Sequence, residues 1–230
     1  MTQLAVEQVS VAYGEGSTAR QVLDRVTLTF DAGTVTLLKG PSGSGKTTLL
    51  SVLGGLLRPH TGRAALNGVD IYGGSDVHRA ACRRRFFGFV FQSCQLFPTL
   101  TALENVRVPL DLRGDARAAG DSRAHALLDL LGLDDRAAAR PRQLSGGEQQ
   151  RVAIARALAA DPAVVLGDEP TAALDAANGR EIAACLRRAA HELGKTVIVV
   201  SHDDRLRAFA DRIVELLDGR VSSDQPRVAA

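Results

Sequence analysis

The sequence predicts an α/β protein with a parallel sheet at its core and antiparallel strands added near the N-terminus. In the C-terminal third, short apolar runs at 163–166 and 196–200 alternate with helical patterns, the order of elements that builds a parallel sheet. A third apolar run, 34–38, leads directly into a glycine-rich loop. Residues 4–13 and 22–30 instead alternate apolar and polar side chains, as half-buried antiparallel strands do.

The remaining elements follow from the period of the apolar residues. A period near 3.6 predicts a helix, and a short apolar run predicts a buried strand. Helices are expected at 46–57, 123–131, 148–160 and 178–193, and one more strand is expected at 86–91. Residues 113–125 are polar and rich in glycine and alanine, so they predict either a loop or a weak helix. The final segment, 221–230, is expected to be a poorly ordered tail.

The composition is that of a soluble globular protein. The chain has 230 residues, of which 45% are hydrophobic and 23% are charged, and this excludes collagen, disulfide scaffolds and intrinsic disorder. A net charge of +2 offers no electrostatic case for a nucleic-acid partner. The three cysteines match no zinc, redox or disulfide pattern. The N-terminus has no signal-peptide pattern, and the apolar runs are far shorter than the roughly 20 residues that cross a bilayer.

The glycine-rich loop has the spacing G-x-x-x-x-G-K-[ST], which is typical of phosphate binding. Its residues are Gly40, Pro41, Ser42, Gly43, Ser44, Gly45, Lys46 and Thr47. Backbone N–H groups of such a loop surround a phosphate, backed by the N-terminus of the following helix. Lys46 supplies a compact charge to the β- and γ-phosphates, and the Thr47 hydroxyl suits Mg²⁺. The alternative is a glycine/serine-rich turn that fits by chance, but the strand–loop–helix context argues against it.

Acidic side chains and a histidine follow two later strands. Asp168 and Glu169 come at the end of the apolar run that starts at Val164. With a phosphate loop upstream, Asp168 is a candidate ligand of Mg²⁺, and Glu169 is a candidate to polarise an attacking water. His202 follows the strand at 196–200, so a parallel sheet brings it to the same carboxyl edge as the loop. The simpler alternative for His202 is an ordinary surface residue.

The octet Leu144–Arg151, with the sequence LSGGEQQR, is the most informative segment. Its simplest interpretation is a helix start, because Ser145 and Glu148 have the spacing of a capping box. A capping box does not need the two glycines between them, which expose N–H groups at a helix N-terminus and predict a second anion site. One nucleotide does not need two such sites from one chain. The second site is therefore expected to serve a nucleotide held by another subunit.

Together these motifs resemble those of the ATP-binding cassette (ABC) ATPases, the nucleotide-binding subunits of ABC transporters. The loop matches the Walker A motif of that family, Asp168 and Glu169 match Walker B with its catalytic glutamate, and the octet matches the family signature. The resemblance also assigns the switch histidine, the Q-loop glutamine, the D-loop aspartate and an aromatic residue that stacks on adenine. These positions are His202, Gln92, Asp175 and Tyr13.

By this resemblance, catalysis involves Glu169, His202 and Gln92, and Mg²⁺ is bound by Thr47, Gln92 and Asp168. ATP is contacted by the loop and by further residues, which are Tyr13, Thr48, Ser145, Gly146, Gly147 and Asp175. The implied fold is that of an ABC ATPase, with a RecA-like parallel core, an N-terminal antiparallel β subdomain and an α-helical signature subdomain. A single domain is expected over 1–220, with the helical insertion at about 93–157.

The resemblance implies an ATPase that dimerises around two ATP molecules and drives an integral-membrane permease. The chain would then be cytoplasmic and peripheral on the inner face of the cell membrane. The segment FGFVFQSCQLFPTLTALENVRVPL resembles the branch with LolD, MacB and FtsE, and its apolar Phe97, Pro98 and Leu100 are expected to contact the permease. The alternatives are a permease-free ABC ATPase of the repair or translation type, and a regulatory module that binds ATP without hydrolysing it.

Overall fold

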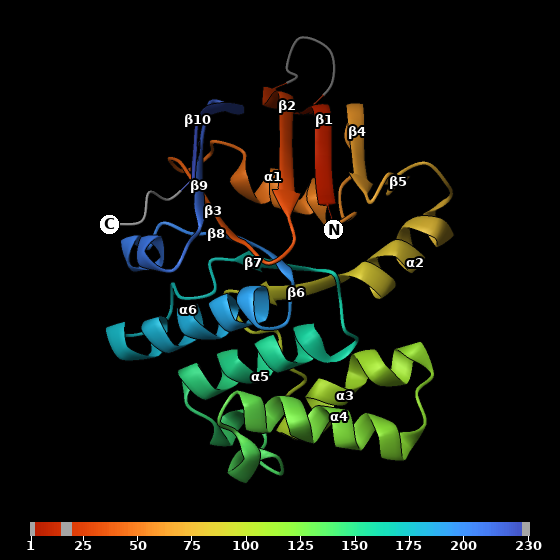
Figure 1. Ribbon diagram of the computed structural model, residues 1–230, viewed down its shortest axis with the longest axis vertical. Coiled ribbons are helices and arrows are strands. Elements are labelled where there is room, and N and C mark those ends of the chain that lie inside the picture. The colour runs from red at the N-terminus through yellow and green to blue at the C-terminus, as the bar shows by residue number, and fades with distance from the viewer. Residues whose placement is uncertain (1–2, 15–19, 227–230) are drawn as a thin grey trace.

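The structure is a computed structural model that describes residues 3–14 and 20–226 (Figure 1). Its helices are α1 (Lys46–Leu53), α2 (Asp76–Phe86), α3 (Ala102–Arg113), α4 (Arg117–Leu130), α5 (Gly146–Ala159) and α6 (Ala176–His191). Its strands are β1 (Gln3–Tyr13), β2 (Arg20–Asp31), β3 (Val35–Lys39), β4 (Thr61–Leu66), β5 (Val69–Asp70), β6 (Phe87–Phe91), β7 (Val164–Asp168), β8 (Thr196–Val200), β9 (Arg212–Leu217) and β10 (Arg220–Pro226). Short 3₁₀ helices are η2 (Asp134–Arg136), η3 (Pro141–Gln143) and η4 (Asp204–Ala208).

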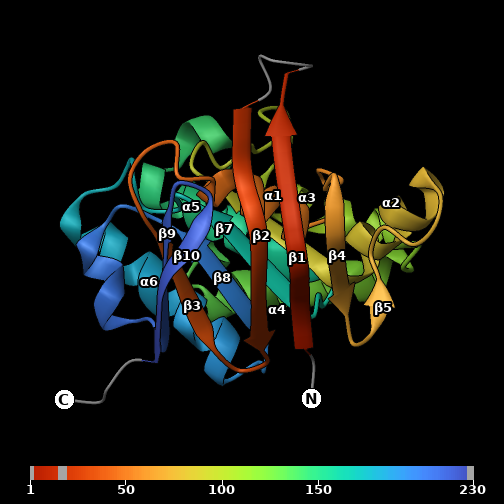
Figure 2. The same ribbon diagram turned by 90° about the horizontal axis from the view of Figure 1, so that it is seen from above.

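The smaller sheet contains four strands in the order β2-β1-β4-β5 and faces the viewer in Figure 2. β1 pairs antiparallel with both β2 and β4, as the alternating pattern of the sequence predicts. Leu4 and Val6 of β1 and Leu28 and Phe30 of β2 are buried in one core with residues of α1. The side chains that alternate with these residues point to the outer face, and this explains the alternating apolar and polar pattern of the two strands.

The larger sheet contains six strands in the order β10-β9-β3-β8-β7-β6. All neighbouring pairs from β9 to β6 are parallel, and β10 runs antiparallel to β9. On β8, Val197 and Val199 belong to the core shared with α3–α6, whereas Ile198 and Val200 belong to the core shared with α1 and the smaller sheet. Burial on both faces explains the continuous apolar runs, and confirms the predicted α/β class with a parallel core.

The helices α3, α4 and α5 form a separate layer at the bottom of Figure 1. Both α3 and α5 begin with a capping box, in which Thr101 and Ser145 exchange hydrogen bonds with a glutamate three residues later. Residues 117–130 form the helix α4, so the weak-helix alternative for this polar segment is the right one over most of its length. Leu127 and Leu128 anchor α4 in the core, which outweighs the glycine in its first turns.

The predicted disorder at the C-terminus is wrong for residues up to Pro226. Arg220–Pro226 form β10, which pairs along β9. Nε of Arg212 donates a hydrogen bond of 2.7 Å to Asp224, so an ion pair across the two strands supports the pairing. Residues 227–230 lie outside the described part of the chain. The short helix before β9 is the 3₁₀ helix η4 rather than a full crossover helix.

Five further elements were not predicted individually from the sequence: β4, β5, β9, α2 and α3. The helix α2 has a polar sequence with only Cys82 buried, and α3 contains Pro109. Within residues 3–14 and 20–226, none of the helices is long and apolar enough to cross a membrane.

Candidate nucleotide site

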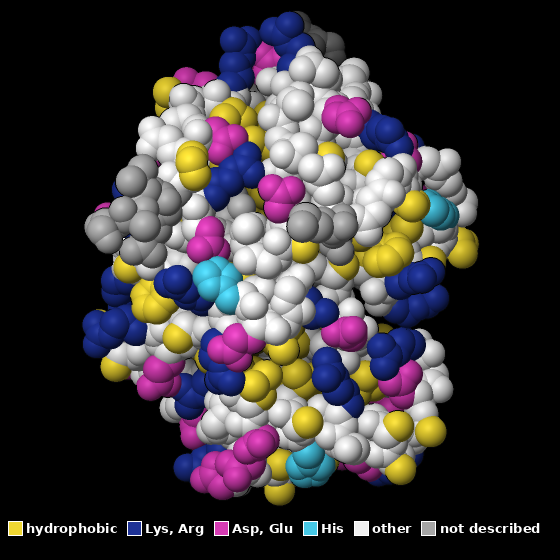
Figure 3. Space-filling model, in the orientation of Figure 1, with side chains coloured by type: hydrophobic (Ala, Val, Ile, Leu, Met, Phe, Trp, Pro, Cys, Tyr) yellow, Lys and Arg dark blue, Asp and Glu magenta, His cyan; other side chains and the backbone are white. Residues whose placement is uncertain are grey.

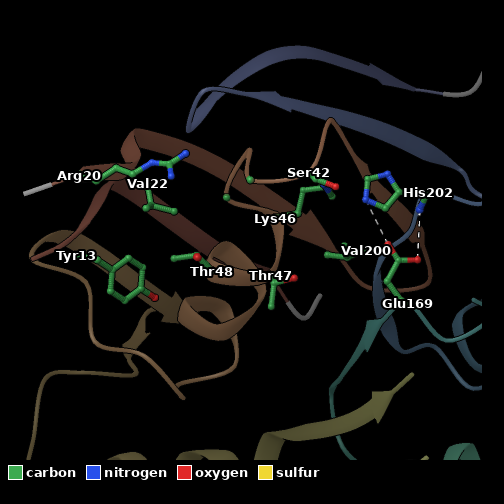
Figure 4. Close-up of a pocket in the computed structure, with 12 residues that line it drawn as sticks. Tyr13, Arg20, Val22, Ser42, Lys46, Thr47, Thr48, Glu169, Val200 and His202 are labelled. Carbon is green, nitrogen blue, oxygen red and sulfur yellow. Dashed lines mark hydrogen bonds and ion pairs between the residues drawn. The ribbon is translucent and has the colours of Figure 1, made fainter. Parts of the chain in front are cut away.

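A pocket of about 560 Å³ opens where the two sheets meet, at the carboxyl ends of β7 and β8 (Figure 4). Tyr13 and Arg20 lie at one end of it, Glu169 and His202 lie at the other, and Lys46 and Thr47 lie between. The lining residues are Tyr13, Arg20, Val22, Ser42, Gly43, Gly45, Lys46, Thr47, Thr48, Glu169, Val200 and His202. Six of the predicted site residues that line the pocket thus belong to the loop or to the first turn of α1.

The loop before α1 requires glycine at two of its positions because other backbone passes close by. Gly40 and Gly45 both have positive φ, at 141° and 98°. A Cβ at Gly40 would lie closer than 3.0 Å to the carbonyl oxygen of Leu216, and one at Gly45 would do the same with Val22. The loop is therefore held between β9 and β2 in a conformation that only glycine permits.

Lys46 places its ammonium inside the curve of the loop. Its Nζ donates hydrogen bonds of 2.8 Å to the carbonyl oxygens of Gly40 and Pro41, and the residue is only 6% exposed. Burial lowers the pKa of Lys46, while the nearby Glu169 and Asp168 act in the opposite direction. A largely buried cation whose contacts in the described structure are carbonyl and hydroxyl oxygens rather than a carboxylate suits an anionic ligand.

Thr47 and Asp168 supply oxygen atoms next to this cation. The Thr47 hydroxyl donates a hydrogen bond of 3.2 Å to Oδ1 of Asp168 across the end of β7. Burial raises the pKa of Asp168 above its ordinary value, and the hydrogen bond from Thr47 partly offsets this. A hydroxyl and a carboxylate fit Mg²⁺, which takes a few protein oxygens and completes its shell with water and phosphate. The part of the chain that the structure describes contains no cluster of three or more His, Cys, Asp or Glu side chains suited to a metal.

Glu169 is held by the strand next to its own. Its backbone N–H donates to the carbonyl oxygen of Val200, at 2.9 Å. Its Oε2 accepts hydrogen bonds from the Ser201 hydroxyl at 3.0 Å and from the His202 backbone N–H at 3.3 Å. Its Oε1 lies 3.7 Å from Nε2 of His202, and Figure 4 shows the imidazole over the carboxylate. The glutamate has φ of 50°, so the backbone adopts an uncommon conformation to place it here.

Comparisons with known proteins identify the family of this chain. Residues 23–172 match the family model described as ABC transporter. The chain belongs to the ABC transporter family. It is 49% identical over 209 residues to the macrolide export ATP-binding/permease protein MacB of Rhodospirillum rubrum, which covers 91% of this chain and 32% of the relative. It is 44% identical over 226 residues to the uncharacterized ABC transporter ATP-binding protein Rv2564 of Mycobacterium tuberculosis, which covers 98% of this chain and 68% of the relative.

Solved structures give the same result for the fold. A dimeric structure of the ATP-binding cassette MJ0796, in a post-hydrolysis state bound to ADP and Pi, is 39% identical with a TM-score of 0.87. The match covers 97% of this chain and 98% of that one. The ABC ATPase fold and the resemblance to the MacB-like branch are therefore confirmed. The chain spans about a third of the length of the macrolide export relatives that it matches.

Several predicted site residues of this ABC cassette lie outside the pocket. Ser145 and Gly146 are exposed at the N-terminus of α5, and Gly147 is buried behind them. Asp175 is the N-cap of α6, where its Oδ1 accepts from the N–H groups of Ala177 and Asn178 at 2.9 Å. Gln92 is exposed in the turn after β6. The single chain thus does not bring Ser145, Gly146 or Asp175 into the pocket, whereas Gln92 directly follows Phe91, the residue of β6 that pairs with Asp168.

The structure adds pocket residues that sequence reasoning missed. Arg20 and Val22 line the pocket from β2, and Ser201 supports Glu169 from the end of β8. Ser201 is fully buried, and its place between a strand and His202 is the one sequence signal that could have found it. Arg20 and Val22 carry no such signal, because only the pairing of β1 and β2 brings them to the site.

The expected permease contact falls in a second hollow, a groove of about 550 Å³ between α2 and α3. Phe97 lines it and is 49% exposed, whereas Pro98 and Leu100 do not line it. Its remaining apolar surface includes Phe89, Phe91 and Leu112. Figure 3 shows Lys or Arg side chains above and below this hollow at the right of the molecule. The lining residues that the structure describes include three arginines and no acidic side chain; the arginines are Arg83, Arg84 and Arg156.

Proposed function

We propose that this chain binds ATP with Mg²⁺ at its phosphate loop, hydrolyses it within a head-to-tail dimer, and drives a permease. One observation carries the proposal: the groups expected to act on one nucleotide are divided between two separate surfaces of the chain. Lys46, Glu169 and His202 line the pocket, whereas Ser145 and Gly146 are exposed at the start of α5, outside it. A second copy can bring its Ser145–Gly147 segment and Asp175 to the open side of the pocket.

The N-terminus of α5 is suited to bind a phosphate of the nucleotide that is held by another copy of the chain. Its capping box uses the backbone N–H of Glu148 and that of Ser145. The N–H groups of Gly146 and Gly147 belong to the first turn, where a helix has no internal partners for them. The positive end of the helix dipole favours a phosphate at this position. Dimeric structures of the similar cassette MJ0796 support an assembly of two copies.

In the proposed reaction, Lys46 binds the β- and γ-phosphates, and Glu169 accepts a proton from the attacking water. Ser201 and the backbone of His202 orient the Glu169 carboxylate through Oε2, which leaves Oε1, on the side of the His202 imidazole, to accept the proton of the water. His202 and Gln92 contact the γ-phosphate. Tyr13, at the opposite end of the pocket from Glu169 and His202, stacks on the adenine ring. Bound Mg²⁺, held by Thr47 and Asp168, would neutralise charge on the phosphates.

The proposal is tested by Glu169→Gln, which keeps the shape of the side chain but removes the general base. Steady-state ATPase activity should fall by about 10²–10⁴-fold, the usual contribution of such a base. EDTA should abolish the activity of the unmodified chain, and added Mg²⁺ should restore it. Light scattering should show that the variant is monomeric without nucleotide and dimeric with ATP. Undiminished turnover would remove Glu169 from the mechanism, and dimers that form equally without nucleotide would contradict the shared site.

The groove between α2 and α3 is the surface we propose for the permease. Its floor is apolar, its charged lining is cationic, and it adjoins the turn that carries Gln92. An amphipathic helix with acidic residues at its margins would fit such a groove. Because Gln95 and Arg156 line the groove as well, a partner seated there contacts the same loop that follows Gln92.

A further inference from the structure

Gly147 is packed against a side chain of its own chain. A Cβ at this position would lie closer than 3.0 Å to both Oδ1 and Cγ of Asn178, and 3.2 Å from the Asn178 Cβ. The same test at Gly146 meets only Leu174, at 3.5 Å, which is ordinary van der Waals contact. The two adjacent glycines of the signature therefore differ, because this chain has room for a methyl group at Gly146 and none at Gly147.

Asn178 is tied in place by Asp175. Its backbone N–H donates to Oδ1 of Asp175 at 2.9 Å, and its Nδ2 donates to Oδ2 at 2.7 Å. These hydrogen bonds hold the pKa of Asp175 below its usual range. For Asn178 to make space at Gly147, its amide would have to leave a charged acceptor, and such hydrogen bonds are about twice as strong as neutral ones.

We propose that Asn178 is a positioning residue that sets the place of the Ser145–Gly147 segment relative to Asp175. The inference rests on the proposed function, in which both segments face the nucleotide held by the other copy. Asn178 contacts Gly147 of α5 through Oδ1 and Asp175 of α6 through Nδ2, so it links the two segments within one chain. On this view glycine is required at 147 because Asn178 occupies the space, and the nucleotide does not impose the requirement.

The test is a double-mutant cycle of Gly147→Ala and Asn178→Ala, made in the Glu169→Gln background. Light scattering gives the ATP concentration at which half of the chain is dimeric, and urea denaturation gives the stability of the nucleotide-free monomer. Gly147→Ala should raise the half-dimerisation concentration about tenfold, as expected for the loss of one charge-assisted hydrogen bond. Adding Asn178→Ala should recover most of that loss and most of the loss in the urea midpoint, because the methyl group then has room.

Gly146→Ala is the matched control. Its methyl group has room in the isolated chain, so Asn178→Ala should not improve any dimerisation defect that it causes. The inference is overturned when the Gly147→Ala/Asn178→Ala protein dimerises no better than Gly147→Ala, since the nucleotide or the other copy would then impose the glycine. It is equally overturned when the urea midpoints of the two substitutions simply add. Absence of ATP-dependent dimers in the Glu169→Gln parent contradicts the proposed function instead, and the urea cycle still decides the packing of Asn178.

Discussion

At the scale of single residues, the position of Glu169 depends on neighbours from β8 rather than on its own strand. The Ser201 hydroxyl donates to Oε2 of Glu169 and accepts from the N–H of Asp203, both at 3.0 Å. Asp203 in turn accepts from the Thr171 hydroxyl at 2.9 Å and from Nε of Arg205 at 2.8 Å. The carboxylate is thus the first member of a partly buried polar network, in which each hydrogen bond helps to hold the next group in place.

Ser201→Ala should lower kcat about tenfold while leaving KM for ATP nearly unchanged, since a less constrained Glu169 spends less time in the reactive position. The hydroxyl touches the carboxylate and does not line the pocket, so ground-state binding of ATP should persist. Steady-state kinetics over a range of ATP concentrations separates kcat from KM. Ser222→Ala is the control, because that hydroxyl donates to the Glu215 carbonyl oxygen on β9 and does not line the pocket. An unchanged kcat in Ser201→Ala would show that Glu169 is oriented without it.

At the scale of elements, two strands of the larger sheet contain a glycine for different reasons. A Cβ at Gly167 in β7 would meet Pro170 and Val199 at 3.5 Å, which is a normal packing distance. A Cβ at Gly88 in β6 would lie closer than 3.0 Å to the carbonyl oxygen of Ala157 in α5. Gly88 therefore permits the close approach of α5 to the sheet, and Gly167 has no comparable constraint.

Gly167→Ala should raise the free energy of unfolding by about 0.4–1 kcal/mol, because it reduces the entropy of the unfolded chain without strain in the fold. Gly88→Ala should lower it by about 1–3 kcal/mol, the usual cost of overpacking. Urea denaturation of the two variants and the unmodified chain measures both effects. A loss of stability in Gly167→Ala equal to that in Gly88→Ala would mean that β7 is packed more tightly than these distances indicate.

The first turn of α5 has an acid-sensitive hydrogen bond. Oε2 of Glu148 accepts from the Ser145 N–H at 2.7 Å, and Oε1 accepts from Nε of Arg136 at 2.9 Å. The hydrogen bond from the Ser145 backbone has the largest effect and that from Arg136 the next, and together they lower the pKa of Glu148 to about 2. Since the folded protein favours the ionised carboxylate, this contribution to stability is complete above the usual glutamate pKa and disappears as the pH falls toward 2.

Glu148→Gln should therefore be less stable than the unmodified chain at pH 7, with a gap that narrows steadily between about pH 5 and about pH 2. The neutral amide does not titrate in this window, whereas the other carboxylates titrate alike in both proteins. Urea midpoints measured at several pH values provide the comparison. A gap that stays constant with pH would assign the stabilisation to shape and hydrogen bonding alone.

At the scale of the whole molecule, the two sheets and the helical layer place two hollows on different surfaces. The nucleotide pocket lies between the sheets, and the groove lies between α2 and α3. The loop after β6 links the larger sheet to the helical layer, because Arg156 of α5 donates hydrogen bonds to the carbonyl oxygens of Cys94 and Gln95. These distances are 2.7 and 2.6 Å. A partner in the groove can therefore act on the segment that carries Gln92 without entering the pocket.

Phe97→Glu should weaken co-purification with the proposed permease partner, because it places a charge on the apolar floor of the groove. ATP-dependent dimerisation of the isolated chain should not change, since the Phe97 side chain is exposed and lines only the groove. Val77→Glu is the matched control: Val77 is 78% exposed on α2 and does not line the groove. Equal co-purification of Phe97→Glu and Val77→Glu would place the permease contact elsewhere.

The sequence alone determined those features that depend on local spacing. The spacing of apolar residues predicted the strands β1, β2, β3, β7 and β8 and the helix α6. In each of these elements the apolar pattern lies within the element itself and does not depend on distant residues. The G-x-x-x-x-G-K-[ST] spacing predicted the phosphate loop in the same way, since successive backbone N–H groups of such a loop surround a phosphate. The side chains of Asp168, Glu169 and His202 were predictable because parallel strands end at one edge of a sheet.

Only the tertiary structure decided the features that depend on residues distant in the chain. It made a strand of Arg220–Pro226, because Arg212 and the edge of β9 offered a partner that the tail sequence does not reveal. It brought Arg20 and Ser201 to the site through strand pairing, and placed Phe97 in the groove without Pro98 and Leu100. It also gave the two adjacent glycines of the signature different surroundings, because Asn178 fills the space beside Gly147 and leaves room for a methyl group at Gly146. Such packing depends on contacts between elements, and these contacts cannot be predicted from the local spacing of apolar residues.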